Sequence, residues 1–251
     1  MRKAMYSVVL ATVASGCLCN AKIDSDLVFY SKFDSVADVE RPTVGPAGVA
    51  CGAEFVEGKS GRALFVPAYV AAAEFLFPEG LPANEGMIEF DAKLGAATQR
   101  FRDGCDPFLF HVKKEHSEGW PIVLELNFNA NNGCGQSGMF CGMPFGRAIV
   151  IPCRSGRYAD MLGEEDTFGW HRYRVCWNCN GIDRDGNIMQ LYIDGSLKGS
   201  GLNTNTDAAA FRESISSPVR LVFSNPGDGQ HGRSPVVIDE FKIWSTARGG
   251  Q

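Results

Sequence analysis

The stretch WHRYRVCWNCNGIDRDGNIMQLYIDG, at residues 170–195, limits what this chain can fold into more than any other. In its first half Tyr173 and Val175 alternate with arginines, and in its second half Leu191 and Ile193 alternate with Gln, Tyr and Asp. An apolar residue at every second position is typical of a strand with one face on a core. The Asp, Gly and Asn residues between the halves favour a tight turn, because they tolerate positive φ. We therefore predict an antiparallel β-hairpin here.

Similar alternation recurs along the chain. The clearest case is GMIEFDAKL, at residues 86–94, in which Ile88 and Phe90 share one face while Glu89 and Asp91 share the other. Many short strands separated by turn residues indicate an all-β fold, a two-sheet antiparallel β-sandwich of the jelly-roll type. The other expected features are strands at residues 27–34, 53–56, 63–66, 106–112, 121–129, 147–152, 219–225 and 236–247, one helical turn within residues 204–214, and a Gly/Asn-rich loop at residues 129–146.

Length, composition and charge limit the number of domains and the kinds of partner. The 251 residues, 45% of them hydrophobic, are enough for one large core, and sandwiches of this size commonly form a single domain. The net charge of −5 and the lack of a basic block argue against nucleic-acid binding. No apolar run reaches the roughly 18 residues that a membrane-spanning helix needs. We expect one domain over residues 22–251, with no nucleic-acid partner and no transmembrane span.

The N-terminus has the pattern of an export signal. Two basic residues precede an apolar run that ends at Cys19, as in a signal peptide. Small residues up to Ala21 suit cleavage by a secretory signal peptidase, which predicts a signal peptide over residues 1–21. Alternatively, the Ala-Ser-Gly before Cys17 is similar to a bacterial lipoprotein box, so that the signal would end before Cys17 and this residue would carry a lipid anchor. We expect an extracellular or cell-envelope protein, either secreted or lipid-anchored.

The cysteines point to the same compartment. Cleavage after Ala21 leaves seven of the nine, which is dense for a cytosolic protein and ordinary for an oxidising environment. Cys134 and Cys141 could staple the Gly/Asn-rich loop. Cys176 and Cys179 form a C-x-x-C pair at the end of a predicted strand, where we expect a structural disulfide involving one or both. A zinc site is the alternative, and a redox role would require a helix N-terminus.

Three of these segments together resemble a known family. The central hairpin with its LYIDG end, the opening LVFYSKFD and the closing VVIDEFKIWSTA are similar to the corresponding strands of laminin G-like domains, in the concanavalin A-like lectin/glucanase superfamily. The resemblance implies a β-sandwich whose first and last strands lie side by side. It implies little about activity, because this fold serves lectins, adhesion modules and glycan-cleaving enzymes.

The resemblance also implies a calcium site. In many relatives an Asp of the closing strand helps to hold a structural Ca²⁺ near the opening strand, and the matching residues here are Asp239 and Asp34. Alternation places Asp239 on the face of Phe241 and Ile243. A carboxylate among apolar neighbours needs a cation, an arginine or several backbone N–H groups. Capping of backbone amides by Asp239 is therefore the alternative to calcium.

A catalytic site fits less well. Glycan hydrolases of this superfamily often carry Glu-x-Asp-x-(x)-Glu on one strand, and retaining hydrolysis needs two carboxyl groups about 5–5.5 Å apart. This sequence has Glu89 and Asp91, but Lys93 follows where the third carboxylate is needed. The charged outer face of a sheet would give the same pattern without chemistry. The sequence therefore leans against an enzyme.

Binding is better supported. Glu125, Asn127 and Asn129 alternate with Leu and Phe, which places their polar groups on the solvent face of one strand, beside the loop that carries Phe140. Planar polar groups next to an aromatic platform suit sugar hydroxyls and C–H faces, and Trp120 is a further platform. We expect an exported, non-catalytic recognition module that binds a carbohydrate or glycoprotein. A glycan-cleaving hydrolase or lyase, and a structural envelope or adhesion protein, are the alternatives.

Overall fold

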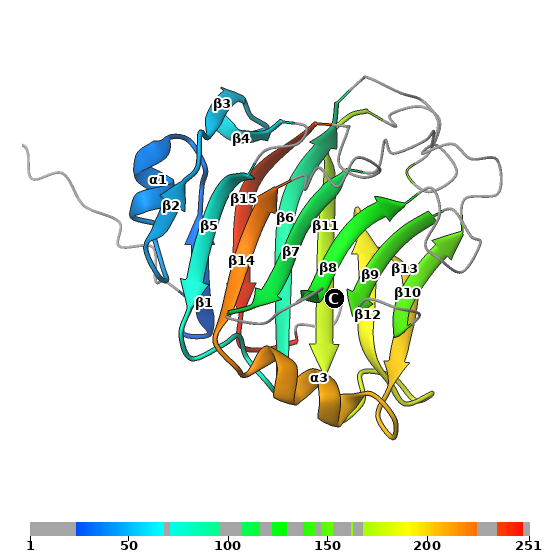
Figure 1. Cartoon of the computed structure of the whole chain (residues 1–251). Helices are drawn as coiled ribbons and strands as arrows, with labels where there is room; N and C mark the ends of the chain where they lie inside the picture. The colour runs from blue at the N-terminus through cyan, green and yellow to red at the C-terminus, as the bar shows by residue number, and fades with distance from the viewer. Residues whose placement is uncertain are drawn as a thin grey trace, which may run out of the picture.

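Two antiparallel sheets lie face to face in the computed structural model, with helix α3 across one end (Figure 1). The predicted jelly-roll-like β-sandwich is confirmed. For some strand residues, including Asn129 and Phe140, the structure describes the backbone and not the side chain. The structure describes residues 24–67, 71–95, 107–115, 122–129, 138–143, 147–152, 162, 168–224 and 235–247.

The first sheet contains eight of the described strands, in the order β13-β12-β11-β6-β15-β4-β3, with β1 paired to β15. These strands are β1 (Leu27–Ser31), β3 (Glu54–Glu57), β4 (Arg62–Val66), β6 (Glu85–Leu94), β11 (His171–Asn178), β12 (Asn187–Ile193), β13 (Ser196–Asn203) and β15 (Val236–Trp244).

The second sheet contains seven of the described strands, in the order β10-β9-β8-β7-β14-β5-β2. These strands are β2 (Gly48–Ala50), β5 (Ala71–Phe77), β7 (Phe108–Lys114), β8 (Ile122–Asn129), β9 (Gly138–Met143), β10 (Arg147–Pro152) and β14 (Val219–Ser224).

Both strand pairings expected from the sequence are present. β11 and β12 form the central hairpin, with Tyr173 opposite Ile193. β1 lies beside β15, with Leu27 opposite Trp244. The opening and closing strands are therefore neighbours in one sheet, as the family resemblance implies.

Part of the Gly/Asn-rich segment is a strand. Residues Gly138–Met143 form β9 between β8 and β10, so the prediction of an unbroken loop over residues 129–146 is wrong. The strands β2, β5 and β13 were not predicted either. β5 begins with three alanines and β13 is rich in Gly and polar residues, so neither shows clear apolar alternation. Pairing with the neighbouring strands β14 and β12 makes them strands.

Two helices accompany the sheets: α1 (Val36–Glu40) and α3 (Ala208–Ile215). α3 is longer than the single turn expected, because Phe211 and Ile215 on one side of it are buried in the core. Neither helix in the described part of the chain is long and apolar enough to cross a bilayer.

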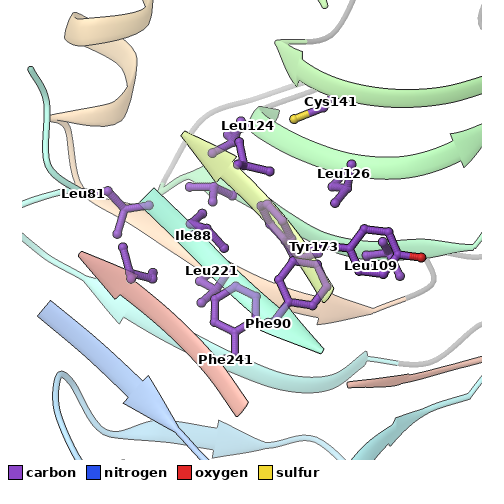
Figure 2. Packing of buried hydrophobic residues seen from close by; sticks show 14 of the residues in the cluster. Leu81, Ile88, Phe90, Leu109, Leu124, Leu126, Cys141, Tyr173, Leu221 and Phe241 are labelled. Atoms are coloured by element: carbon purple, nitrogen blue, oxygen red, sulfur yellow. The ribbon is translucent and has the colours of Figure 1, made fainter. Parts of the chain in front are cut away.

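The core lies between the two sheets, and aromatic rings occupy its centre (Figure 2). Phe241 of β15 contacts Phe90 within its own sheet, with ring centroids 5.1 Å apart. It also contacts Phe223 and Phe110 of the opposite sheet, at 4.9 and 5.7 Å. All four side chains are at most 1% exposed. Phe241 therefore joins the two layers of the sandwich.

A glycine makes room for the buried tryptophan of the hairpin. Trp177 lies opposite Gly86 across the β11–β6 pair, and its indole covers the glycine so closely that any Cβ there would collide with the ring. The indole N–H donates to the carbonyl of Pro82 at 2.9 Å. The large ring is thus buried with its one polar group satisfied.

Candidate functional site

Glu125 and Asn127 lie on the side of the seven-stranded sheet that faces away from the core. Leu124 and Leu126 of the same strand belong to the core, and successive residues of a strand point to opposite sides. His111 of β7 is directly opposite Glu125. Because directly opposed residues share a face, His111 lies on this side too. We call this side the outer face.

Ser224, at the end of β14, completes a cluster around His111. Its Oγ lies 3.4 Å from His111 Nε2. Phe108 packs edge-on against the imidazole with ring centroids 5.9 Å apart, and it lies opposite Asn127. We call His111, Glu125, Asn127 and Ser224 the polar cluster; their exposed fractions are 0%, 7%, 2% and 5%.

Side-chain atoms of His111 and Asn127 in this cluster have no hydrogen-bond partner within the described residues. They are Nδ1 of His111 and Oδ1 of Asn127, and both are buried. Buried polar atoms in folded proteins nearly always have a partner, and leaving one without costs about 1–3 kcal/mol. A ligand that supplies hydrogen-bonding groups to these two atoms would recover that free energy.

His111 is neutral in this environment. Burial, with a further contribution from the positive charge of Lys113, lowers the pKa of His111 from 6.5 to about 3. A neutral imidazole has one N–H and one bare nitrogen, and its tautomer decides which of them faces Ser224. Nδ1 can therefore donate or accept, whereas Oδ1 of Asn127 can only accept.

The neighbours Ser224, His111 and Glu125 are the residue types of a nucleophile, a base and an orienting acid, but their geometry does not suit catalysis. The distance of 3.4 Å between Ser224 Oγ and His111 Nε2 is long for such a hydrogen bond. Nδ1, the atom that a triad carboxylate holds, has no partner among the residues described. A base with a pKa of about 3 also takes up a proton poorly at neutral pH. The polar cluster suits hydrogen bonding, not proton transfer.

The predicted exposure of Glu125 and Asn127 is wrong, since both are buried. Alternation decides which side of a sheet a residue points to and leaves open what covers that side. Phe140 lies opposite Asn127 in the β8–β9 pair and Asn129 ends β8, but their side chains lie outside the described part of the structure. Trp120 lies outside the described residues altogether. The ligand-binding roles of these residues stay predictions.

Sequence reasoning gave no role to His111 or Ser224. The only signal in the sequence was one histidine within the apolar run FLFHV. The two residues are 113 positions apart in the chain, and the β7–β14 pairing brings them together. Such a long-range neighbour cannot be inferred from local alternation.

Asp239 accepts hydrogen bonds from the turn between β3 and β4, and Asp34 accepts one from the first residue of β4. Oδ2 of Asp239 accepts from the backbone N–H groups of Lys59 and Ser60, at 2.9 and 3.0 Å. Oδ1 of Asp34 accepts from the backbone N–H of Arg62 at 2.7 Å. Capping of backbone amides, the alternative to calcium, is therefore what the structure shows at Asp239.

A β-bulge turns Asp239 away from the core. Asp239 lies opposite Asp91, whose neighbours along β6 are core residues, so both aspartates face outward. After Asp239, β15 contains one residue more than the matching part of β6, and Glu240 there has a φ of 54°. This bulge reverses the alternation. The prediction that Asp239 shares the face of Phe241 is therefore wrong.

Asp34 and Asp239 would be the protein ligands of the calcium ion that the family resemblance implies. Calcium takes about six to eight oxygen ligands. In the ranges that the structure covers, no group of three or more His, Cys, Asp or Glu side chains could hold a metal ion. Burial raises the pKa of Asp239 against the opposing effect of the two amide hydrogen bonds from Ser60 and Lys59. The described donors thus do not complete a calcium site, and calcium binding stays a prediction.

Replacing Asp239 with Ala is expected to destabilise the protein by about 1–3 kcal/mol, because two backbone amides lose their acceptor. Asp239→Asn keeps one acceptor oxygen and removes the buried charge, so it should cost less. Urea unfolding at neutral pH measures both free energies. Amide hydrogen exchange at Lys59 and Ser60 should quicken in the alanine variant, and unchanged exchange there would contradict this role of Asp239.

Glu89 and Asp91 form ion pairs on the outer side of the eight-stranded sheet. Arg174 Nη2 lies 2.6 Å from Glu89 Oε2, and Arg172 Nη2 lies 2.8 Å from Asp91 Oδ2. Burial raises the pKa of Asp91, but hydrogen bonds from Arg172 and Lys59 outweigh this and hold the pKa below its usual value. A carboxyl group that stays ionised cannot act as the general acid of a glycosidase. Asp91 is therefore unsuited to the general-acid role, and Glu89 is already engaged in an ion pair with Arg174.

No disulfide joins the cysteines that the structure describes. Cys176 packs with Met87 and Trp244, whereas Cys179 belongs to the main core, so the C-x-x-C pair does not form one site. Burial raises the pKa of Cys176 to about 12, which makes it a poor thiolate for zinc or redox chemistry. Cys141, expected to staple a loop, is buried in the core. The described cysteines outside any disulfide are Cys51, Cys141, Cys176 and Cys179.

No family model matches the sequence, and no curated protein matches it. Solved structures do match the fold. The ligand-binding domain of botulinum neurotoxin serotype D, in complex with N-acetylneuraminic acid, has a TM-score of 0.56 at 12% identity, over 90% of this chain and 48% of that one. The binding domain of Paraclostridial Mosquitocidal Protein 1 has a TM-score of 0.56 at 13% identity, over 90% and 50%. Trypanosoma rangeli sialidase in complex with sialic acid has a TM-score of 0.58 at 12% identity, over 90% and 32%.

The likeness extends to the fold alone. This chain spans between about a third and a half of the length of these three proteins. Identities of 12–13% do not transfer a ligand or an activity. One of these neighbours is a ligand-binding domain solved in complex with N-acetylneuraminic acid, and all three agree with the β-sandwich fold. They do not single out the laminin G-like family.

Proposed function

We propose that this chain is a non-catalytic recognition module that binds a carbohydrate or glycoprotein through the polar cluster. The observation that carries the proposal is the buried Oδ1 of Asn127, which has no partner in the described part of the structure. Nδ1 of the neighbouring His111 is in the same situation. A sugar hydroxyl both donates and accepts, so adjacent hydroxyls of one sugar could satisfy both atoms.

The sandwich fold supports the proposal, because structural neighbours of this chain include domains that bind sugars. Membership of the laminin G-like family and export to the cell surface or medium belong to the same proposal. The proposal also includes secretion or lipid anchoring, and structural calcium at Asp34 and Asp239. A higher melting temperature in the presence of Ca²⁺ but not Mg²⁺ would support calcium binding, and fractionation of cells that produce the full chain would test export.

Asn127→Ala is expected to weaken glycan binding at least tenfold, or by about 1.4 kcal/mol, because the buried acceptor is lost. A glycan array identifies the ligand, and isothermal titration gives its affinity for both proteins. Asn180→Ala is the matched control, since it makes the same chemical change at an exposed turn position. Equal weakening by both substitutions would place the ligand elsewhere.

The same preparation separates a binder from a hydrolase. A binding module should release no reducing ends from a panel of polysaccharides, and Glu89→Gln should leave its ligand affinity unchanged, because Arg174 already pairs with Glu89. Release of reducing ends that Glu89→Gln abolishes would establish an enzyme instead.

A further inference from the structure

The chemistry of the polar cluster restricts the class of sugar that it can take. Oδ1 of Asn127 is an acceptor only, so it needs a group that donates a hydrogen bond. A carboxylate or sulfate oxygen has no proton to donate at neutral pH, whereas a hydroxyl has. The first requirement on the ligand is therefore an O–H or N–H group at this position.

The polar cluster itself contains no positive charge. His111 is held neutral by its burial, and the other three members are an amide, a hydroxyl and a carboxylate. An acidic sugar buried against these groups would lose its hydration without gaining an ion pair, and an unpaired buried charge is costly. Burying a hydroxyl group costs far less hydration free energy than burying a charged group.

Two cations that the structure describes on the outer face, Arg220 and Lys113, already interact with carboxylates. Arg220 lies 2.7 Å from Glu115 and 3.3 Å from Glu74. Lys113, opposite Arg220 and two residues from His111, is half-buried. Burial lowers its pKa, and the attraction of Glu74 opposes this. An anionic ligand would have to compete with Glu74 and Glu115 for these two cations.

We infer that the polar cluster takes an uncharged saccharide through its hydroxyl groups and discriminates against sugars that carry a carboxylate or sulfate. The inference rests on the proposed function and gives its ligand class. It separates this chain from the neurotoxin domain, which was solved in complex with an acidic sugar.

The test uses pairs of saccharides that differ only in one acidic group, such as lactose and lactose sulfated on one hydroxyl of its galactose. The neutral member of each bound pair should bind at least tenfold more tightly than the acidic one. Its affinity should change less than twofold between low and high salt, because no ion pair forms on binding. Isothermal titration at two salt concentrations measures both.

Two variants test whether the neutral sugar binds at the polar cluster. Asn127→Leu, which keeps the volume and removes the acceptor, should weaken binding of the neutral sugar at least tenfold. Lys113→Met removes a cation two residues from His111 and suits a half-buried position, so it should leave that affinity within twofold of the original. Circular dichroism and melting temperatures serve as the control that both variants fold.

The possible failures are distinguishable. Tighter binding of the acidic member, weakened by salt and by Lys113→Met, would overturn the neutral-sugar inference and leave the proposed function standing. If no glycan of either kind binds, the proposed function fails. If Asn127→Leu leaves the glycan affinity unchanged, the proposed site fails. In either case the inference fails as well.

Discussion

Between about pH 7 and pH 4 the free energy of unfolding is expected to fall by about 3 kcal/mol because of His111 alone. In the unfolded chain this residue takes up a proton near its ordinary pKa of 6.5, whereas in the folded protein it stays neutral until about pH 3. Protonation therefore favours the unfolded state throughout this window. The stabilisation is complete above pH 6.5 and is lost as the pH falls towards 3.

His111→Gln isolates this contribution, because glutamine does not titrate. Urea unfolding of both proteins at several pH values gives the difference between their free energies, and this difference should shrink by about 3 kcal/mol from pH 7 to pH 4. Asp91 and Asp239 also titrate with shifted pKa values, in opposite directions, but they are common to both proteins and cancel. Parallel pH profiles for the two proteins would show that His111 is not buried as the structure has it.

Phe241→Ala is expected to destabilise the protein by about 3–5 kcal/mol, the usual cost of removing a large buried ring. The ring is fully buried and contacts Phe90 in its own sheet and Phe110 and Phe223 in the other. The substitution therefore leaves a cavity at the place where the two sheets meet. A lower urea midpoint and a lower melting temperature measure the loss.

Leu197→Ala is the matched control for Phe241→Ala. Leu197 on β13 is 51% exposed, so its truncation should change the free energy of unfolding by no more than about 0.5 kcal/mol. Similar losses for the two variants would contradict the aromatic core. A glycan affinity that survives in folded Phe241→Ala would show in addition that binding does not depend on this part of the core.

The main strands were predictable because their alternation is local. In GMIEFDAKL, Ile88, Phe90, Ala92 and Leu94 lie in the core and the charged residues lie outside, as its period of two requires. The hairpin of residues 170–195 was predictable for the same reason, with Asp183 holding its turn by accepting hydrogen bonds from the N–H groups of Asp185 and Asn187. β9 and β13 were missed since their glycines carry no side chain that could show a pattern.

The candidate site was predictable only in part. Glu125 and Asn127 were identified from one strand, on the correct side of the sheet, but their burial was not. His111 and Ser224 come from two further strands, and only the strand order places them next to Glu125. Strand order depends on contacts between residues far apart in the chain, which a local pattern does not contain.

By itself, the sequence determined that the chain forms strands and which side chains of each strand point to the same side of the sheet. It also determined that the strands make a sandwich. The physical reason is that apolar residues at every second position can be buried only in a sheet with one covered face. Only the tertiary structure decided the neighbours. It paired β7 with β8 and β14 to assemble the polar cluster, and it inserted the bulge at Glu240 that turns Asp239 from the core to the turn of residues 58–61. One extra residue in a strand reverses every side chain on one side of it, and nothing in the apolar alternation of that strand shows where the reversal occurs.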